Sequence, residues 1–408
     1  MLPPLLSWGQ PSQTKPPAPV KQETDELKQQ LDVDAAALSK IPADPLVRPD
    51  PLAPIFQPVD KLSDRLVQSA RLKFGATYTF LNQYATIVPD GTARHNQLSG
   101  RLDFTGAWSV YDHGSSAGSM SLLVRSGTNI GVSQQFNLSD SIGSGLYLNC
   151  LQGGGPQEPI TLNVLYWRQD FFAKRLSFYV GKIHPNEFVT LSMFNNDERT
   201  QFLNGANDGN LAVAYDGTYA AGGAVEFQAT RHIYIHAIAV DTEGAQQRNI
   251  ETLVDRKFAE DVELGWRSGS LGEQYRHIRV GIWRDDTKNN GSGYGGGIGF
   301  DHEFENGLVP FGRFALGTST GTAIKQVEGI GLARVRPFGR RGDLFAMAFN
   351  YSEPSNGKHH ESLFESFYRL RLTQSINIGP DLEVSIHPTY ATKAYSTTLL
   401  GARMEIIF

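Results

Sequence analysis

The amino-acid sequence predicts an all-β chain, a transmembrane antiparallel β-barrel of about 16 strands with a short N-terminal helical extension. Three observations support this prediction. The last segment of the chain has one apolar and one polar face, the same alternation returns along the sequence, and long connections alternate with short ones. A strand that faces lipid must pair both of its backbone edges, so such strands imply a closed barrel.

The last ten residues, 399–408, alternate between large apolar side chains and small or charged ones. Leu400, Met404 and Phe408 fall on one face, whereas Arg403 and Glu405 fall on the other. Successive side chains of a strand point to opposite faces, so this segment suits a strand with lipid outside and water inside. No run of about 20 apolar residues occurs, which excludes a transmembrane helix.

The composition is compatible with a barrel but does not demand one. Hydrophobic residues make up 40% and aromatic residues 11% of the 408 residues, averages that a soluble all-β protein also shows. The net charge of -5 is small, and the Lys and Arg residues form no basic arm, so we expect no nucleic-acid partner. The single Cys150 rules out an internal disulfide.

Four stretches of the chain differ in composition. Residues 1–20 predict a Pro-rich disordered N-terminus without the features of a signal peptide, so we expect a mature form with an added Met. Residues 21–41 carry apolar side chains at near-heptad spacing, which predicts a periplasmic amphipathic helix or short coiled coil, with a loosely ordered solvated helix as an equal alternative. Residues 42–68 predict a Pro-rich linker, and 69–408 the outer-membrane barrel.

Alternating segments recur through the barrel region. In one of them, Val262, Leu264 and Trp266 oppose Glu263 and Arg267. The predicted strands cover residues 70–81, 98–109, 119–126, 162–171, 175–183, 218–230, 232–241, 257–268, 275–285, 293–304, 308–317, 327–337, 342–351, 363–376, 381–392 and 397–408. This number lies within the range of bacterial barrels and leaves room for an aqueous lumen.

The connections between these segments alternate in length. The long ones include 82–97, 127–161, 184–217 and 242–256, and the short ones include 172–174, 305–307 and 338–341. Outer-membrane barrels have short periplasmic turns and longer loops outside, so we expect both ends of the barrel on the periplasmic side.

Charged residues on the expected lumen-facing side are candidates for contact with a solute. They are Arg71, Arg101, Asp103, Arg125, Glu226, Glu263, Arg279, Arg313, Arg334, Arg369 and Glu383, together with Lys182, Asn195, Asn196, Asp197, Glu198 and Arg199 from the longest distinctive connection. Arginine forks and carboxylates supply the donors and acceptors that sugar hydroxyls need. For any one of them, an ion pair that only stiffens the wall is about twice as frequent an explanation, because large lumens are lined by many charges.

The connection GKIHPNEFVTLSMFNNDERTQFLNG, Gly181 to Gly205, has the most distinctive sequence. Over about thirty-five residues it resembles the OprB family of carbohydrate-selective porins, with a Gly-Lys pair at the end of a strand, an acidic and aromatic loop, and an Asn-, Asp- and Phe-containing stretch at Phe194 to Asn204. His184 and Pro185 stand where the family has an Asp, and only some relatives carry an N-terminal helical extension.

The resemblance implies passive diffusion of small carbohydrates through a water-filled pore, with loop 184–217 folded inward to narrow it. Among the charged and polar candidates described above, we expect these to bind the substrate: Lys182, Asn195, Asn196, Asp197, Glu198, Arg199, Arg101, Arg125, Glu226, Arg279 and Arg369. Outer-membrane lipid and small sugars are the expected partners, and we expect no catalytic residue, cofactor or metal. Homo-oligomers and a periplasmic partner of the N-terminal helix are left open.

Three other functions fit parts of the sequence. An exporter of an extracellular polysaccharide would use the helix near residues 27–41 to dock a periplasmic partner, and a uniformly charged lumen would favour it. A barrel lipase would need a Ser-His pair at the lipid boundary, which no spacing suggests. A structural or adhesive barrel would have its lumen filled by residues 23–58.

Trp283 and Tyr275 could form a sugar-stacking slide, but a membrane-interface girdle is the favoured interpretation.

Three motif matches are better explained by strands and turns. Gly291, Gly293 and Gly296 fit a dinucleotide pattern but lead into a strand, which favours a hairpin. The Gly-Ser-Gly spacing of residues 114–118 lacks a following helix and predicts a periplasmic turn. The pair 359–360, two adjacent histidines, has no further ligand at metal spacing and predicts an exposed loop.

Overall fold

The computed structural model describes residues 44–89, 94–151, 155–190, 192–194, 197–214, 219–269, 274–287, 291–318, 322, 324–355 and 359–408. The helix predicted over residues 21–41 therefore lies outside the described residues, as do Asn195 and Asn196. None of the helices within these ranges has the length and apolar character that a membrane span requires.

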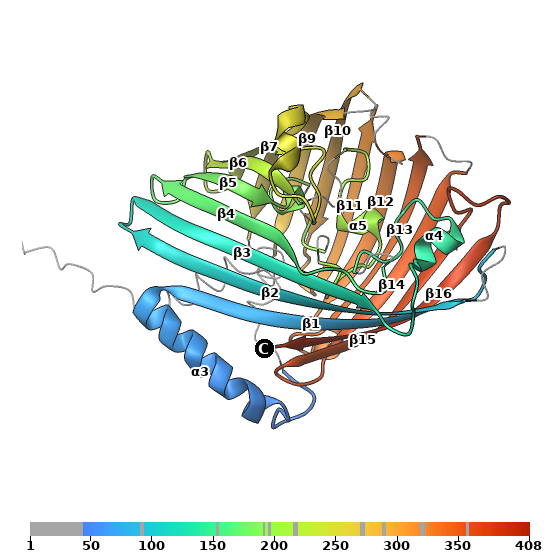
Figure 1. Ribbon diagram of the computed structural model, residues 1–408, viewed down its shortest axis with the longest axis horizontal. Coiled ribbons are helices and arrows are strands. Elements are labelled where there is room, and N and C mark those ends of the chain that lie inside the picture. Colours follow the sequence, from blue (N-terminus) through green and yellow to red (C-terminus); the bar gives the residue numbers. More distant parts are fainter. Residues whose placement is uncertain are drawn as a thin grey trace, which may run out of the picture.

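Sixteen antiparallel strands close into one barrel, in which each strand pairs with its neighbours in sequence and β1 pairs with β16 (Figure 1). The strands are β1 Leu72–Ala85, β2 Asn96–Asp112, β3 Ser116–Asn129, β4 Thr161–Phe171, β5 Leu176–Ile183, β6 Ala220–Gln228, β7 Ile233–Asp241, β8 Phe258–Ser268, β9 Arg276–Thr287, β10 Gly291–His302, β11 Leu308–Gly317, β12 Ile324–Val335, β13 Leu344–Pro354, β14 Glu361–Arg371, β15 Ile376–Ile386 and β16 Ser396–Ile407. The predicted fold class is confirmed.

Burial alternates along the strands as the two-faced pattern predicts. On β16 the side chains of Arg403 and Glu405 are buried inside the barrel, whereas Leu400 and Ala402 are exposed on the outer surface. On β8 Glu263 is buried, and Val262 and the other apolar partners of the pattern are exposed outside. Closure satisfies the backbone edges of the barrel strands, and the apolar outer surface suits lipid.

Two strand predictions are displaced at the end of the chain. A turn was expected near residues 377–380, but β14 ends at Arg371 and β15 begins at Ile376. The expected turn contains Gly379 and Pro380, residue types that are frequent in turns. They lie instead within β15, where pairing is interrupted only between the pairs Phe367↔Asp381 and Leu370↔Ile378, because proline has no N–H to donate.

The predicted linker over residues 42–68 is wrong in its second half, because helix α3 spans Ala53–Ala70. Its first turn contains Pro54, a position where the missing N–H costs no helical hydrogen bond. The helix ends at Arg71, which adopts a left-handed conformation (φ 54°) as the C-cap. Arg71 is therefore an exposed residue between helix and strand, and its prediction as a lumen-facing strand residue is wrong.

The segment before α3 runs along the short-turn end of the barrel. Asp44 forms an ion pair with Arg341 in the β12–β13 connection (2.8 Å). Further along, the Asp50 carboxylate accepts a hydrogen bond from the backbone N–H of Ser375 in the β14–β15 turn (2.7 Å). Burial raises the pKa of Asp50, but hydrogen bonds from Leu52, Ser375 and Thr373 lower it by a larger amount. The pKa of Asp50 therefore lies below its ordinary value. Residues 44–52 thus lie at the rim and lead into α3.

Two long connections carry the remaining helices into the barrel. The β3–β4 connection contains α4 (Leu138–Ile142), and the β5–β6 connection contains the 3-10 turn η1 (Pro185–Glu187) and α5 (Gly205–Asp208). The short 3-10 turns η2 (Glu251–Asp255) and η3 (Pro337–Gly339) lie in other connections. Figure 1 shows α4 and α5 within the outline of the barrel. Only the inward position of the β5–β6 loop was predicted.

Candidate functional site, an inward-folded loop and its wall contacts

The β5–β6 loop leaves the wall at a position that only glycine can occupy. Gly181, near the end of β5, has φ +145°, and a Cβ there would lie 2.2 Å from the carbonyl oxygen of Leu165. The next residue, Lys182, donates from Nζ to the carbonyl oxygens of Gln246 (2.8 Å) and Arg248 (2.6 Å). Lys182 therefore ties β5 to the β7–β8 connection.

Wall carboxylates on separate strands accept hydrogen bonds from the backbone of this loop. Thr190 N–H donates to Glu263 Oε2 on β8 (2.7 Å), and Ala214 N–H donates to Asp285 Oδ2 on β9 (3.0 Å). Leu203 N–H donates to Glu365 Oε1 on β14 (2.7 Å). Since these strands lie on different sides of the barrel, the loop is held across the lumen, as the sequence analysis predicted.

Wall arginines hold the loop through its carbonyl oxygens. Arg403 Nη1 on β16 donates to the carbonyl oxygen of Glu198 (2.6 Å). On β11, Arg313 donates to the carbonyl oxygen of Gly209. Buried carbonyls and N–H groups need such partners, so the lumen-facing charges satisfy a loop that has little regular structure of its own.

A buried ion-pair cluster joins the loop to β2 and β3. Arg101 Nε donates to Asp103 Oδ2 (2.9 Å), and Arg101 Nη1 donates to Glu198 of the loop. Arg125 Nε donates to Asp103 Oδ1 (2.6 Å), and its Nη1 donates to the Tyr219 hydroxyl (2.7 Å). The structure thus brings together three of the predicted site residues, Arg101, Arg125 and Glu198.

Two adjacent acidic residues of the loop, Asp197 and Glu198, are ionised despite their burial. Burial raises the pKa of Glu198, but Arg101 and Arg125 lower it by a larger amount, so the pKa lies below its ordinary value. Burial likewise raises the pKa of Asp197, and Arg199 with Thr200 brings it below its ordinary value. Arg199 Nε donates to Asp197 Oδ1 (2.8 Å), and its Nη1 donates to Thr77 Oγ1 on β1 (3.3 Å).

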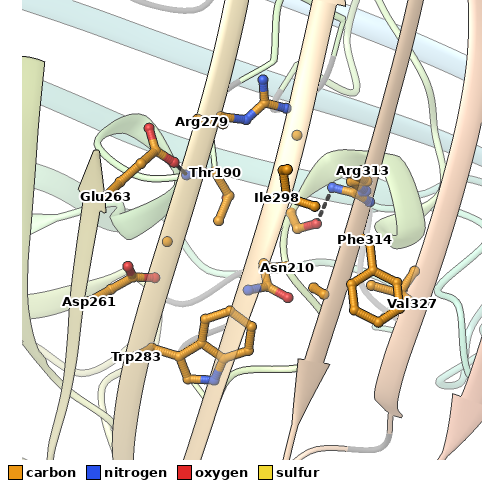
Figure 2. A pocket seen from close by; sticks show the side chains of 15 residues that line it. Thr190, Asn210, Asp261, Glu263, Arg279, Trp283, Ile298, Arg313, Phe314 and Val327 are labelled. Carbon is orange, nitrogen blue, oxygen red and sulfur yellow. Dashed lines mark hydrogen bonds between the residues drawn. The ribbon is translucent and has the colours of Figure 1, made fainter. Parts of the chain in front are cut away.

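Opposite this cluster, the loop and strands β8 to β12 enclose a hollow (Figure 2). Figure 2 shows Thr190 and Asn210 of the loop facing the wall residues Glu263, Arg279 and Trp283. Gly295 of β10 leaves the space that the Trp283 ring occupies, because a Cβ at this position would lie 2.2 Å from the ring. Large side chains of β9 can therefore lie against the wall.

Trp283 and Tyr275 do not belong to a membrane-interface girdle, and that interpretation is wrong. Trp283 is 5% exposed and packs in a buried cluster that includes Leu211 and Ala212 of the loop. Tyr275 packs against a second buried cluster that includes Phe194 of the loop. Both rings were correctly assigned to the lumen-facing side of their strand, where they support the loop.

The remaining predicted site residues are dispersed. Arg279 on β9 pairs with Asp301 on β10 (2.8 Å), which also accepts from Ser192 of the loop. Glu226 on β6 accepts from the Tyr179 hydroxyl (2.5 Å). Arg369 lies on the inward side of β14, two residues after the buried Phe367. The structure therefore does not gather the predicted residues into one site.

Besides Arg71, the lumen-facing prediction of Arg334 is wrong. Arg334 on β12 shares the outward side with Ile330, and the inward residues are Val327, Gly329, Gly331, Ala333 and Val335. Small residues on the inward side gave too little contrast with the outward side for the alternation to be assigned correctly.

The sequence analysis did not predict that the β3–β4 connection also folds inward. Ser144 Oγ and Gly145 N–H donate to the two carboxylate oxygens of Glu361 on β14 (2.7 and 2.9 Å). Leu148 offers its carbonyl oxygen to Gln83 Nε2 on β1 (3.2 Å). The sequence contains a signal for this inward fold, because four large apolar residues, Leu138, Ile142, Leu146 and Leu148, lie in a connection rather than in a strand. All four are buried in the structure.

Comparisons with known proteins agree with this architecture. A family model described as carbohydrate-selective porin, OprB family, matches residues 124–408, more than half of the chain. Porin AaxA of Chlamydia abortus is 23% identical over 254 residues, which cover 60% of this chain and 56% of that protein. Porin AaxA of Chlamydia felis is 22% identical over 254 residues, with 60% and 57% covered. The chain thus spans about half the length of the curated relatives it matches.

The fold is shared with solved porins. The high-pH structure of Pseudomonas putida OprB has a TM-score of 0.71 at 13% identity, covering 86% of this chain and 97% of that chain. The low-pH structure of the same protein has a TM-score of 0.54 at 13% identity, with 86% and 96% covered. The family match over residues 124–408 shows that the chain, a closed 16-stranded barrel, belongs to the OprB family of carbohydrate-selective porins, β-barrels of the bacterial outer membrane.

Proposed function

We propose that this porin lets small carbohydrates diffuse passively across the outer membrane, down their gradient and with no catalytic step. The observation that supports this proposal is the loop 184–217 held across the lumen beside a charge cluster of both signs. The family to which the chain belongs is described as carbohydrate-selective.

The chemistry of the cluster suits hydroxyl groups. A sugar hydroxyl both donates and accepts, so a passage lined by guanidinium donors and carboxylate acceptors can replace its water without a net charge requirement. A ring of one charge would select ions instead. Arg125, Glu198 and Arg199 provide both kinds of group on one side of the passage.

The geometry divides this cluster into two roles. The side chain of Arg101 is 2% exposed and is enclosed by Asp103 and Glu198, so we assign it to positioning. The side chain of Arg199 is 16% exposed and retains a face toward solvent. We therefore propose Arg199, Arg125 and Glu198 as the solute contacts. Asn195 and Asn196, which lie outside the described residues, stay predictions from the sequence.

The mixed charge of the wall favours small sugars over an exported polysaccharide. An exporter would be indicated by a long lumen of one charge, whereas here Arg101, Asp103 and Arg125 alternate in sign on neighbouring strands. Proteoliposome swelling is the direct test of the proposal, with mono-, di- and oligosaccharides compared with amino acids and salts of similar size.

We expect small sugars to enter faster than the matched amino acids and salts, and Arg199→Ala to reduce this preference severalfold. Arg168→Ala is the matched control, because Arg168 is an arginine of β4 that pairs with Asp170 (2.7 Å) rather than with the loop. Equal entry of sugars and salts through the unaltered protein would contradict the proposal. A similar loss of preference in both variants would remove the loop from the selective step.

A further inference from the structure

Helix α3 presents an apolar stripe that is largely exposed. Ile55, Val59 and Leu62 are 64%, 38% and 51% exposed, and Leu66 continues the stripe at the same helical spacing. Figure 1 shows the helix beside the start of β1, below the barrel wall. Exposed apolar side chains gathered on one side of a helix indicate an interaction surface.

The helix lies beside a free strand edge rather than over a face of the sheet. Strand β1 pairs with β2 from Leu72 onward, but with β16 only from Ala76 and Thr77 onward. The carbonyl oxygen of Phe74 falls in the unpaired stretch and accepts from Ser63 Oγ of the helix (3.3 Å). Helix α3 therefore occupies the place that a longer β16 would have taken. One flank of the helix faces outward and the other inward.

Two contacts show which flank is which. Val67 packs against Ala107, which shares the lumen-facing side of β2 with Arg101 and Asp103. Trp108 lies on the outward side, and its Nε1 donates to the carbonyl oxygen of Ala70 (3.1 Å). The direction around the helix from Val67 toward Ala70 is thus the direction from the lumen side to the outer side.

The apolar stripe lies further in that same direction. At about 100° per residue, Ala70 is about 60° from Val67, and the four stripe residues lie about 80–140° from it in the same sense. Asp60 and Asp64 lie about 20–60° from Val67 in the opposite sense. The apolar flank therefore faces the outside of the barrel, and the acidic flank faces the lumen side.

We infer that α3 is an interfacial helix whose stripe, Ile55, Val59, Leu62 and Leu66, is immersed in the periplasmic leaflet of the outer membrane. The surface next to it supports lipid as the occupant. Trp108 and Phe104 of β2 are exposed on the outer wall, and Phe74 stacks on Phe104 (6.2 Å between ring centroids). The stripe extends this apolar belt at the short-turn end, where an amphipathic helix gains by burying one side in the headgroup region.

The inference is tested with single-cysteine variants in a Cys150→Ser background. An environment-sensitive fluorophore is attached at Val59→Cys on the stripe or at Asp64→Cys on the opposite flank. The labelled full-length protein is reconstituted into vesicles of phosphatidylethanolamine and phosphatidylglycerol, with or without lipids that carry a doxyl quencher near the headgroup. Heat-modifiable migration in gels verifies that each variant retains a folded barrel.

We expect the label at position 59 to emit at shorter wavelength and to be quenched several times more strongly by the doxyl lipid than the label at position 64. Equal weak quenching at both positions would overturn the inference. A blue shift at position 59 that grows with the protein-to-lipid ratio, without doxyl quenching, would also overturn it and would assign the stripe to a second copy of the chain.

Discussion

Two parts of the barrel wall hold the same loop by different means. On the β2–β3 side, Arg101 and Arg125 pair with Asp103 and Glu198, so buried charges of opposite sign compensate one another. On the β14 side, Glu365 uses its two oxygens to accept from the backbone N–H groups of Leu203 (2.7 Å) and Asn204 (3.3 Å). The difference teaches that a lumen-facing charge serves either to balance another charge or to fix the path of the chain.

The second device recurs around the barrel. Glu263 and Asp285 accept from loop backbone N–H groups, and Glu361 does the same for the β3–β4 connection. Of these three carboxylates, only Glu263 was a candidate for solute contact in the sequence analysis. Their geometry makes them anchors of the inward chain, and the more exposed arginines of the other side are better placed to meet a solute.

The largest effect is expected on the compensated side. Arg101→Ala removes one of the two arginines that compensate Asp103 and Glu198, and Arg125 alone then faces two buried carboxylates. Breaking a buried ion pair costs about 3–5 kcal/mol, because buried charge is left incompletely compensated. The free energy of unfolding in urea, measured in detergent micelles, checks this. Arg168→Ala, which breaks a more exposed pair, serves as the control and should cost less. Equal losses in the two variants would contradict the assignment.

A second effect on the same side depends on pH. His184 stacks on the Tyr219 ring (4.6 Å between centroids) and is buried near Arg125. Burial, followed by Arg125, lowers the pKa of His184 from 6.5 to about 4. Because the unfolded chain binds this proton first, stability is complete above pH 6.5 and falls as pH decreases toward 4, by about 3 kcal/mol in all.

His184→Phe keeps the ring but cannot bind a proton, so it should lose this slope between pH 6.5 and 4.5. Unfolding midpoints in urea, compared across that range for both proteins, provide the measurement. The lowered pKa values of Asp197 and Glu198 add a further loss only as pH falls below the ordinary carboxyl range. An unchanged slope in His184→Phe would remove His184 as its origin.

The barrel could be predicted where side-chain contrast is large. Large apolar residues against charges, as in 399–408, fixed the face of each residue from a period of two. The assignment failed at Arg334, where small residues line the inward side, and near Gly379, where a turn was expected inside a strand that contains Gly and Pro. It failed again at 53–70, because prolines near the start of a helix were taken for a linker.

The candidate site was harder to predict because its contacts join distant parts of the chain. The inward loop 184–217 came from a family resemblance, and no local pattern indicated which wall residue each loop atom would meet. Ser144 and Glu361, for example, are 217 positions apart in the chain, and only the folded barrel brings them into contact. Sequence alternation says that a charge faces the lumen, but the loop path decides whether it is an anchor or remains open to a solute.

A smaller effect on stability, with a larger one on the passage, is expected on the β14 side. Glu365→Ala leaves the Leu203 N–H without its acceptor, which costs roughly 1–3 kcal/mol. Since Glu365 fixes the loop rather than balancing Glu198, we expect larger and more variable single-channel conductance in planar bilayers, with the β2–β3 ion pairs retained. Glu383→Ala is the matched control, because Glu383 is a neighbouring inward carboxylate that accepts from Gln83 Nε2 on β1 (3.0 Å). If Glu365→Ala conducts like the unaltered protein, Glu365 does not fix the path of the loop. The β2–β3 cluster then holds the loop without it, and the proposed difference between the two sides of the wall is wrong.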